Sequence, residues 1–250
     1  MAFDVAADAY DRFMGRYSSQ LSAPLAEFAG IEPHHRVLDV GCGPGQLAAE
    51  LVERVGAANV AAVDPSEKFV AAMRERHPGV ELVLAAAEEL PFEDDAFDAA
   101  LAQLVVHFMA DAPRGIAEMA RVTKPGGVVA ASFWDARGRR TPMQPFWASV
   151  AAVDVETGGR AVQVGAGDLS ALLEGAGLRE VEETEATVAV EYASFDEWWL
   201  PYTYGVGPAG DLVSSLPPER QEAIREHARD LLGEPPFTIE ATALVARGRV

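Results

Sequence analysis

The sequence has very little cysteine and comparatively little positive charge. One cysteine, Cys42, occurs in 250 residues, so the chain cannot form an internal disulfide, which is typical of a protein from a reducing compartment. Only 20 Lys and Arg residues stand against 39 Asp and Glu residues, which gives a formal net charge of −19. Because such a charge repels nucleic-acid backbones and anionic lipid surfaces, we expect neither nucleic acid nor a membrane as a partner.

Long apolar runs and metal-binding spacings are also missing from the sequence. No apolar run approaches the ~20 residues that a membrane-spanning helix needs. The first residues show no basic segment followed by an apolar core, so we expect a cytoplasmic protein. The histidines and acids do not follow spacings such as His-x-x-x-His, so we expect no metal site.

A strand, a glycine-rich turn and a helix follow one another near residue 40. Val37–Val40 is a short apolar run typical of a buried strand, and Gly41-Cys42-Gly43-Pro44-Gly45 comes directly after it. Apolar residues then recur at helical spacing from Leu47 to Val55. Because glycines let the backbone turn sharply and approach a ligand closely, the pattern predicts a ligand site at the end of this strand.

A second apolar run, Val60–Val63, ends in an acid, Asp64. In a parallel sheet this acid lies at the tip of the neighbouring strand, where its carboxylate can accept both hydroxyls of a ribose. A dinucleotide fingerprint would need a small residue at position 46, and the chain has Gln46 there. The two segments therefore predict a nucleoside-containing ligand and argue against a dinucleotide.

Strand-like and helix-like segments alternate from His35 to Trp134. This alternation predicts a parallel sheet with helices on both faces. Two further strand-like segments, 188–192 and 237–242, are separated by an insertion that is rich in aromatic residues. The first five strands are expected near 35–40, 59–64, 80–85, 97–103 and 127–133, the last of them after a turn at Pro125-Gly126-Gly127.

Four stretches together resemble the motifs of the class I S-adenosylmethionine-dependent methyltransferases. The Gly-x-Gly-x-Gly run after Asp39 is similar to the family's first motif, and Asp64-Pro65-Ser66 is similar to its second. Ala87–Phe92 resembles the segment after the third strand. Phe97–Gln103, followed by Arg121–Gly127, resembles the fourth strand and the turn into the fifth.

The resemblance covers about residues 10–134 and is closest to the branch that contains the quinone-biosynthesis methyltransferases and many small-molecule enzymes. It implies a three-layer α/β/α sandwich with a Rossmann-like sheet of seven mostly parallel strands, an antiparallel last strand and an α-helical lid. The implied organisation is a single domain over 1–250, with an N-terminal cofactor-closing helix at about 4–30, a core sheet at about 35–192 and 236–250, and a lid insertion at about 193–235.

The resemblance also implies an activity and a set of cofactor contacts. The implied reaction transfers the methyl group of S-adenosylmethionine to a small, hydrophobic or aromatic acceptor and releases S-adenosylhomocysteine. A monomer or a homodimer is expected, with the small-molecule acceptor as its partner. The implied cofactor-binding residues are Tyr10, Arg16, Asp39, Gly41, Cys42, Gly43, Asp64, Pro65, Phe69, Ala87, Glu88 and Gln103.

Three of these cofactor contacts have a particular interpretation. Arg16, in slight preference to Arg12, is expected to pair with the methionine carboxylate of the cofactor. Asp39 either orients the methionine amine through water or only satisfies amides of the loop. Ala86 stands where the family often has Asp, so the adenine amino group either lacks its side-chain acceptor or finds it in Glu88.

The acceptor side has one titratable candidate and several aromatic ones. His107 can take a proton from an acceptor hydroxyl or amine, or it can be a structural histidine. Trp134, Trp198, Trp199 and Tyr202 are core residues or line an acceptor pocket. The last three are expected in a mobile cover above the carboxyl ends of the strands, opposite the transferred methyl group.

Two other functions remain compatible with these patterns. A non-catalytic S-adenosylmethionine-binding module would show the same motifs, because methyl transfer needs no covalent catalyst. A nicotinamide-dependent oxidoreductase can be built on a similar sheet, but Gln46 argues against it.

Overall fold

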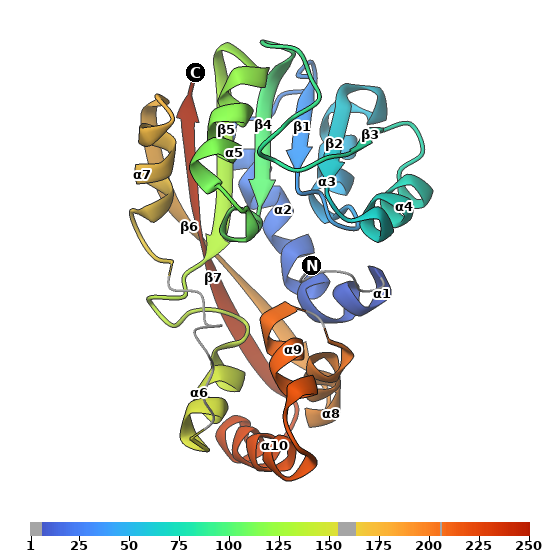
Figure 1. Ribbon diagram of the computed structural model, residues 1–250, viewed down its shortest axis with the longest axis vertical. Coiled ribbons are helices and arrows are strands. Elements are labelled where there is room, and N and C mark those ends of the chain that lie inside the picture. Colours follow the sequence, from blue (N-terminus) through green and yellow to red (C-terminus); the bar gives the residue numbers. More distant parts are fainter. Residues whose placement is uncertain (1–6, 155–163, 206) are drawn as a thin grey trace.

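The computed structural model describes residues 7–154, 164–205 and 207–250. Its sheet has the strand order β3-β2-β1-β4-β5-β7-β6 (Figure 1). Strand β7 is antiparallel to β5 and β6, and the other neighbouring pairs are parallel. The predicted mostly parallel sheet of seven strands with an antiparallel last strand is therefore confirmed. The strands are β1 Val37–Val40, β2 Val60–Asp64, β3 Glu81–Leu84, β4 Phe97–Gln103, β5 Thr123–Trp134, β6 Arg179–Tyr192 and β7 Phe237–Arg249.

The central strands are nearly continuous apolar runs because helices cover both faces of the sheet. Every residue of β1 and β2 is buried. Side chains alternate between the faces, so Val37 packs with α2 (Arg16–Phe28) and α3 (Gln46–Val55), whereas Leu38 packs with α5 (Ala112–Val122) and α7 (Asp168–Gly175). The strand order reverses beside β1, which lies between β2 and β4. A ligand crevice is expected at the carboxyl ends of the strands at such a point.

A helix cap and a glycine turn show how local sequence shapes the connections between the strands. Helix α4 (Glu67–Arg76) begins after Ser66, whose hydroxyl accepts the N–H of Phe69. The expected turn at Pro125-Gly126-Gly127 instead lies within β5, where the register with β4 shifts and Gly126 has a φ of +80°. Glycine tolerates this conformation, so the strand continues through an irregularity rather than ending there. No helix in the described ranges is both long and apolar enough to cross a membrane.

The N-terminal segment lies across the carboxyl end of the sheet. It consists of α1 (Ala7–Tyr10), a π-helical turn η1 (Asp11–Gly15) and α2, so the helix predicted at about 4–30 is present from residue 7, and residues 4–6 lie outside the described ranges. The Asp11 carboxylate accepts hydrogen bonds from Gln46 Nε2 at 2.6 Å and from Arg76 Nη2 at 2.7 Å. These two contacts tie the segment to the helices that follow β1 and β2.

An α-helical insertion separates the last two strands, as predicted. Strands β6 and β7 continue past β5, because Trp134 at the end of β5 pairs with Ala243 while the β6–β7 pairing runs on to Tyr192 and Phe237. Figure 1 shows the insertion and α6 (Gln144–Ala152) gathered beyond the carboxyl end of β5. The insertion contains α8 Phe195–Trp199, η4 Leu200–Tyr204, α9 Gly207–Ser215 and α10 Pro218–Leu232.

Candidate cofactor and acceptor site

Two adjoining pockets open at the carboxyl ends of β1, β2 and β4. The outer pocket encloses about 750 Å³ and the inner pocket about 100 Å³. Both pockets are lined by Gly41, Asp64, Phe69, Val105 and Phe108, so they form one continuous crevice. The outer pocket adds Pro65, Ser66, Glu67, Leu84, Ala86, Ala87, Glu88, Met109 and Ala110. The inner pocket adds Tyr10, Phe13, Met14, Gly43, Gln103, Leu104, His107, Trp134, Met143, Gly207 and Pro208.

The Asp64 carboxylate stands where the two pockets meet. Its Oδ2 accepts the N–H of Gly43 at 2.9 Å, and its Oδ1 accepts the N–H of Ser66 at 2.8 Å. Each carboxylate oxygen has a second lone pair, so both can accept a further hydrogen bond from a ligand. The side chain is nearly buried, and this burial raises its pKa.

The glycine-rich loop turns at Gly41 and Gly43, which have φ values of +71° and +53°. The N–H groups of Gly41 and Cys42 both donate to the Val63 carbonyl at the end of β2, at 2.8 and 3.0 Å. A Cβ atom on Gly41 would lie 2.4 Å from Cγ2 of Val105, whereas a Cβ atom on Gly43 would meet nothing within 4 Å. Gly41 is therefore required by the packing of the protein itself, while the space beside Gly43 is open.

We expect Gly41→Ala to lower the free energy of unfolding by about 2–4 kcal/mol, because left-handed strain adds to the clash with Val105. Gly43→Ala is the matched control and should cost only the strain, about 1–2 kcal/mol. Chemical denaturation measures both values. Adding Val105→Ala should recover part of the loss in the Gly41 variant, and equal losses for the two glycine variants would contradict the predicted clash.

Asp39 lies beneath the loop, with 1% of its surface exposed, and does not line either pocket. The Ala48 N–H donates to its carboxyl group, but its Oδ2 has no hydrogen-bond partner among the described residues. Burial, with a smaller contribution from the charge of Asp64, raises the pKa of Asp39 to about 8. The group thus keeps a buried oxygen without a partner two residues before Gly41, which lines both pockets.

This raised pKa makes the stability of the unliganded protein depend on pH. In the unfolded chain an Asp has a pKa of about 3.9, so between about pH 4 and 8 the unfolded state loses a proton that folded Asp39 keeps. The folded state is therefore progressively destabilised over this range. Asp39→Asn removes the effect, so the free energy of unfolding of the variant minus that of the parent should rise between pH 5 and 8. Denaturant titrations at several pH values measure it, and a constant difference would mean that Asp39 is ionised throughout.

Strand β4 ends at Gln103, and Leu104 follows it in an unusual backbone conformation. Gln103 Nε2 donates to the Ser18 carbonyl at 2.9 Å and to Ser22 Oγ at 3.2 Å, which leaves Oε1 buried without a partner among the described residues. Leu104 has a φ of +61°, and its N–H donates to the Ser132 carbonyl at 3.0 Å. A left-handed leucine is strained, and such strain is commonly held at functional sites.

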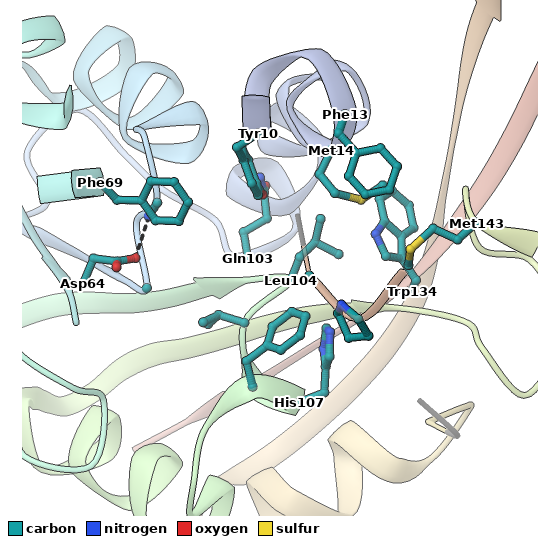
Figure 2. A pocket seen from close by; sticks show the side chains of 16 residues that line it. Tyr10, Phe13, Met14, Asp64, Phe69, Gln103, Leu104, His107, Trp134 and Met143 are labelled. Atoms are coloured by element: carbon teal, nitrogen blue, oxygen red, sulfur yellow. Dashed lines mark hydrogen bonds between the residues drawn. The ribbon is translucent and has the colours of Figure 1, made fainter. Parts of the chain in front are cut away.

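An aromatic pair and a histidine line the inner pocket from opposite sides. Figure 2 shows Tyr10 and Phe69 on one side of the space and His107 across from them. The rings of Tyr10 and Phe69 meet edge to face at 5.6 Å, and burial raises the pKa of Tyr10 to about 12. Burial lowers the pKa of His107 to about 4, so its imidazole is neutral near pH 7, and its Nδ1 has no partner in the described part of the chain.

The outer pocket has apolar walls and an acidic rim. Leu84 and Phe108 line it although 49% and 40% of their surfaces are exposed, which makes them available to a flat apolar ligand. Ala87 and Glu88 lie along the same pocket. One carboxylate oxygen of Glu88 accepts the N–H of Asp111 at 3.1 Å, which positions this side chain at the pocket edge.

Besides Asp39, two residues carried over from the resemblance line neither pocket. Arg16 donates to Glu197 Oε1 and to the Glu191 carbonyl, each at 2.8 Å, and its guanidinium stacks over the Tyr192 ring. It therefore ties α2 to β6 and α8 and does not line either pocket, contrary to its expected contact with a methionine carboxylate. Cys42 is also absent from both walls, because its side chain is buried with Ala48 and Met73.

Three aromatic residues of the insertion lie in the core and not in the cover above the strand ends where they were expected. Trp198, Trp199 and Tyr202 are at most 5% exposed and line neither pocket. The Tyr202 ring stacks on Phe146 at 4.5 Å and meets Phe13 at 4.9 Å, so these rings form an aromatic core behind the wall of the inner pocket. Of the predicted acceptor residues only Trp134 lines the pocket, because it ends a sheet strand at the crevice.

The inner pocket also contains residues that the sequence reasoning did not assign to it. Phe13 and Met14 reach the pocket from η1 in the N-terminal segment. Met143 precedes α6, and Gly207 and Pro208 begin α9, so they reach the pocket from two separate segments after β5. The Gly207-Pro208 pair is typical of a turn, but no pattern in the sequence shows that this turn reaches the pocket.

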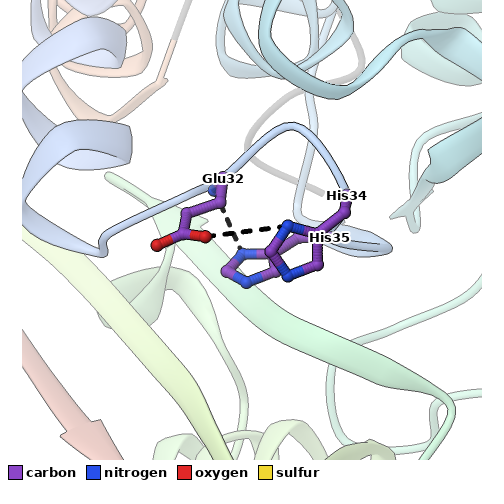
Figure 3. A group of neighbouring side chains, drawn as sticks. All are labelled: Glu32, His34 and His35. Atoms are coloured by element: carbon purple, nitrogen blue, oxygen red, sulfur yellow. Dashed lines mark hydrogen bonds and ion pairs between the residues drawn. The ribbon is translucent and has the colours of Figure 1, made fainter.

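Glu32, His34 and His35 form a separate cluster before β1, at the end of the sheet opposite the crevice (Figure 3). Their ligand atoms lie within 4.8 Å of one another, a geometry that can hold a metal ion. The side chains of His34 and Glu32 are 74% and 65% exposed, and the Glu32 N–H donates to His35 Nδ1. The cluster contributes nothing to the crevice.

Sequence comparison with known proteins relates this chain to methyltransferases. Residues 38–131 match the sequence profile of a family described as "Methyltransferase domain". The chain is 36% identical over 140 residues to an uncharacterized methyltransferase of Mycobacterium tuberculosis, covering 56% of this chain and 54% of that protein. It is 36% identical over 132 residues to a malonyl-[acyl-carrier protein] O-methyltransferase of Pectobacterium atrosepticum, covering 52% and 50%. These matches span about half the length of each relative.

A solved structure shows the same fold over nearly the whole chain. The YcgJ protein of Bacillus subtilis superimposes with a TM-score of 0.62 and covers 93% of this chain and 97% of its own. The sequence identity is 21%, so this likeness concerns the fold alone.

Proposed function

Because the chain carries a class I S-adenosylmethionine-dependent methyltransferase domain, we propose that it transfers a methyl group from S-adenosylmethionine to a small apolar acceptor. The observation that carries the proposal is the continuity of the crevice. Asp64 stands at the junction of a large outer pocket, suited to a nucleoside, and an apolar inner pocket, suited to an acceptor. The crevice thus has room for both reactants on either side of one anchoring carboxylate.

In this proposal the outer pocket and the loop hold the nucleoside. Asp64 accepts the ribose hydroxyls through its free lone pairs, and the open space beside Gly43 admits the ligand. The adenine lies between the exposed apolar faces of Leu84 and Phe108, next to Phe69. The adenine amino group is assigned to Glu88, whose second carboxylate oxygen can replace the acceptor that Ala86 lacks.

The methionine end of the cofactor is assigned to the region between Gln103 and Asp39. Gln103 Oε1 and Asp39 Oδ2 are buried acceptors without partners among the described residues. Buried polar atoms are normally satisfied by protein, water or ligand, so these two orphaned acceptors, which come from the paired strands β1 and β4, fit a ligand that brings donors. The ammonium group of a bound methionine moiety supplies such donors. Tyr10 closes this region from above.

The inner pocket is assigned to the acceptor. Trp134, Met143, Met14 and Phe13 form its walls, as Figure 2 shows. The bound cofactor supplies an electrophilic methyl group, so the protein has to hold the attacking atom in line and exclude water. The apolar walls serve both requirements, and His107 is the polar group assigned to contact the acceptor.

Two alternative functions make different predictions. A dinucleotide-dependent oxidoreductase needs an anion-accepting helix start after the glycine loop. Here Gln46 at the start of α3 is bound by the Asp11 carboxylate, which places negative charge near that position. A non-catalytic binding module would share the outer pocket and would differ only in its lack of turnover.

Titration calorimetry should show binding of S-adenosylhomocysteine and no binding of NAD or NADP. Incubation with S-[methyl-³H]adenosylmethionine and a panel of apolar hydroxyl and amine compounds should then transfer label to at least one of them. Binding of NAD without binding of S-adenosylhomocysteine would overturn the proposed cofactor. If S-adenosylhomocysteine binds but no label is transferred to any compound of the panel or to any component of a cell extract, a non-catalytic binding module is favoured.

A further inference from the structure

The inner pocket lacks positive charge. No Lys or Arg occurs among the described residues that line either pocket. The ionisable side chains on the inner wall are Tyr10, Asp64 and His107, and none of them is a cation near pH 7. An anionic ligand would therefore meet Asp64, which is itself negative when ionised, and no cationic side chain of the described wall.

The surroundings of the pocket increase this bias against anions. Asp64 on the pocket wall and Asp39 beneath the glycine-rich loop are both buried, and a neighbouring anion would make their ionisation still less favourable. Arg12 stands between the lining residues Tyr10 and Phe13, but it is exposed and lines neither pocket. Arg16, at the start of α2, is held in an ion pair with Glu197. Moving the carboxylate of an acceptor from water into the inner pocket is costly, because no cationic side chain of its described wall pairs with the charge.

The polar groups that the pocket does offer suit a neutral hydrogen-bond donor. His107 is uncharged near pH 7, and a neutral imidazole has one nitrogen that accepts a hydrogen bond. The remaining surface comes from the thioethers of Met14 and Met143, the indole of Trp134 and the side chain of Leu104. Thioethers and aromatic rings adapt to apolar bodies of different shape.

We infer that the acceptor reacts through a neutral hydroxyl or amine on an apolar body, with His107 as its hydrogen-bond acceptor, and that the chain does not methylate carboxylates. The inference rests on the proposed function and narrows its substrate class. It separates this chain from the relative named a malonyl-[acyl-carrier protein] O-methyltransferase, in spite of their 36% identity.

The reaction balances without a further reagent. For a hydroxyl acceptor, the oxygen lone pair forms the new bond to the methyl carbon, and the carbon–sulfur bond breaks with its electron pair on sulfur. The acceptor proton passes to His107 and then to water. The products are the methyl ether, neutral S-adenosylhomocysteine and one proton. An amine acceptor reacts in the same way through nitrogen.

The test compares acceptors that differ only in the reacting group. The protein saturated with S-adenosylhomocysteine is titrated with 2-naphthol, 2-naphthoate, octanol and octanoate near neutral pH. Of 2-naphthol and octanol, the compound that binds more tightly should bind at least about tenfold more tightly than the carboxylate with the same apolar group. Equal or tighter carboxylate binding, or no binding of either hydroxyl compound, would overturn the inference. Failure of S-adenosylhomocysteine itself to bind would overturn the proposed function instead.

A charge introduced at Met143 provides an independent test. This residue is half-buried at the pocket wall, so a longer polar side chain can extend along the opening. Met143→Arg should improve the carboxylate-to-hydroxyl affinity ratio about tenfold, because the guanidinium pairs with the carboxylate. Met143→Gln is the matched uncharged control and should leave that ratio unchanged. The same shift in both variants would show that charge does not decide acceptor choice.

Discussion

Asp64→Asn is expected to weaken the binding of S-adenosylhomocysteine by about ten- to a hundredfold. The Asp64 oxygens already accept the N–H groups of Gly43 and Ser66, and in the proposed complex they also accept the ribose hydroxyls. An Asn side chain keeps one acceptor oxygen and turns the other into a donor. A hydrogen bond to a charged group contributes about 1.5–3 kcal/mol, and about 1.4 kcal/mol is tenfold in affinity. Titration calorimetry gives the dissociation constants.

A surface charge variant controls for the loss of one negative charge. Glu53 is exposed on α3, so Glu53→Gln removes the same formal charge without touching either pocket. The dissociation constant of this variant for S-adenosylhomocysteine should stay within about twofold of the parent's, because solvent ions screen exposed surface charges. If the Asp64 variant is folded and binds as tightly as the parent, Asp64 does not belong to the cofactor site.

Trp198→Ala is expected to lower the free energy of unfolding by about 3–5 kcal/mol. The side chain is 2% exposed, and its ring centroid lies 5.0 Å from that of Tyr202 and 5.6 Å from that of Phe195. Removing the indole leaves a cavity inside the aromatic core. For a chain of this length the loss corresponds to a fall in Tm of about 6–20 °C. Thermal and denaturant unfolding measure it.

Leu200→Ala is the matched control from the same part of the insertion. Leu200 is 47% exposed, so its truncation should change the free energy of unfolding by about 0.5 kcal/mol or less. The affinity for S-adenosylhomocysteine, measured well below the unfolding transition, should be unchanged in both variants. If Trp198→Ala instead unfolds like the parent and loses only acceptor binding, then Trp198 lines the acceptor pocket.

The half of the crevice that we assign to the cofactor follows closely from the sequence. Gly41, Gly43 and Asp64 were assigned from the ends of two apolar runs, and the structure brings all three together. This was possible because the direction of parallel strands fixes which loops meet at one edge of a sheet. Asp39 was left between two interpretations, and its unpartnered oxygen is a consequence of packing that no spacing shows.

The acceptor half could not be predicted in the same way. The insertion was recognised by its aromatic content, but Trp198, Trp199 and Tyr202 pack into the core, while Gly207 and Pro208 reach the pocket. Aromatic residues are favoured both in cores and in pockets, so composition does not distinguish the two. Here the difference depends on Phe13 and Phe146, which lie far apart in the sequence and cover the Tyr202 ring.

The sequence by itself determined the sheet, its layers and the edge at which the crevice opens. Buried parallel strands require continuous apolar runs, and the turns at their ends require glycine or an acid, so these features are local in the chain. The tertiary structure alone decided that Arg16 pairs with Glu197, that Met143 and Pro208 meet in one wall, and that this wall carries no cation among the described residues. Those properties depend on contacts between distant segments, which are set by packing and not by any local pattern.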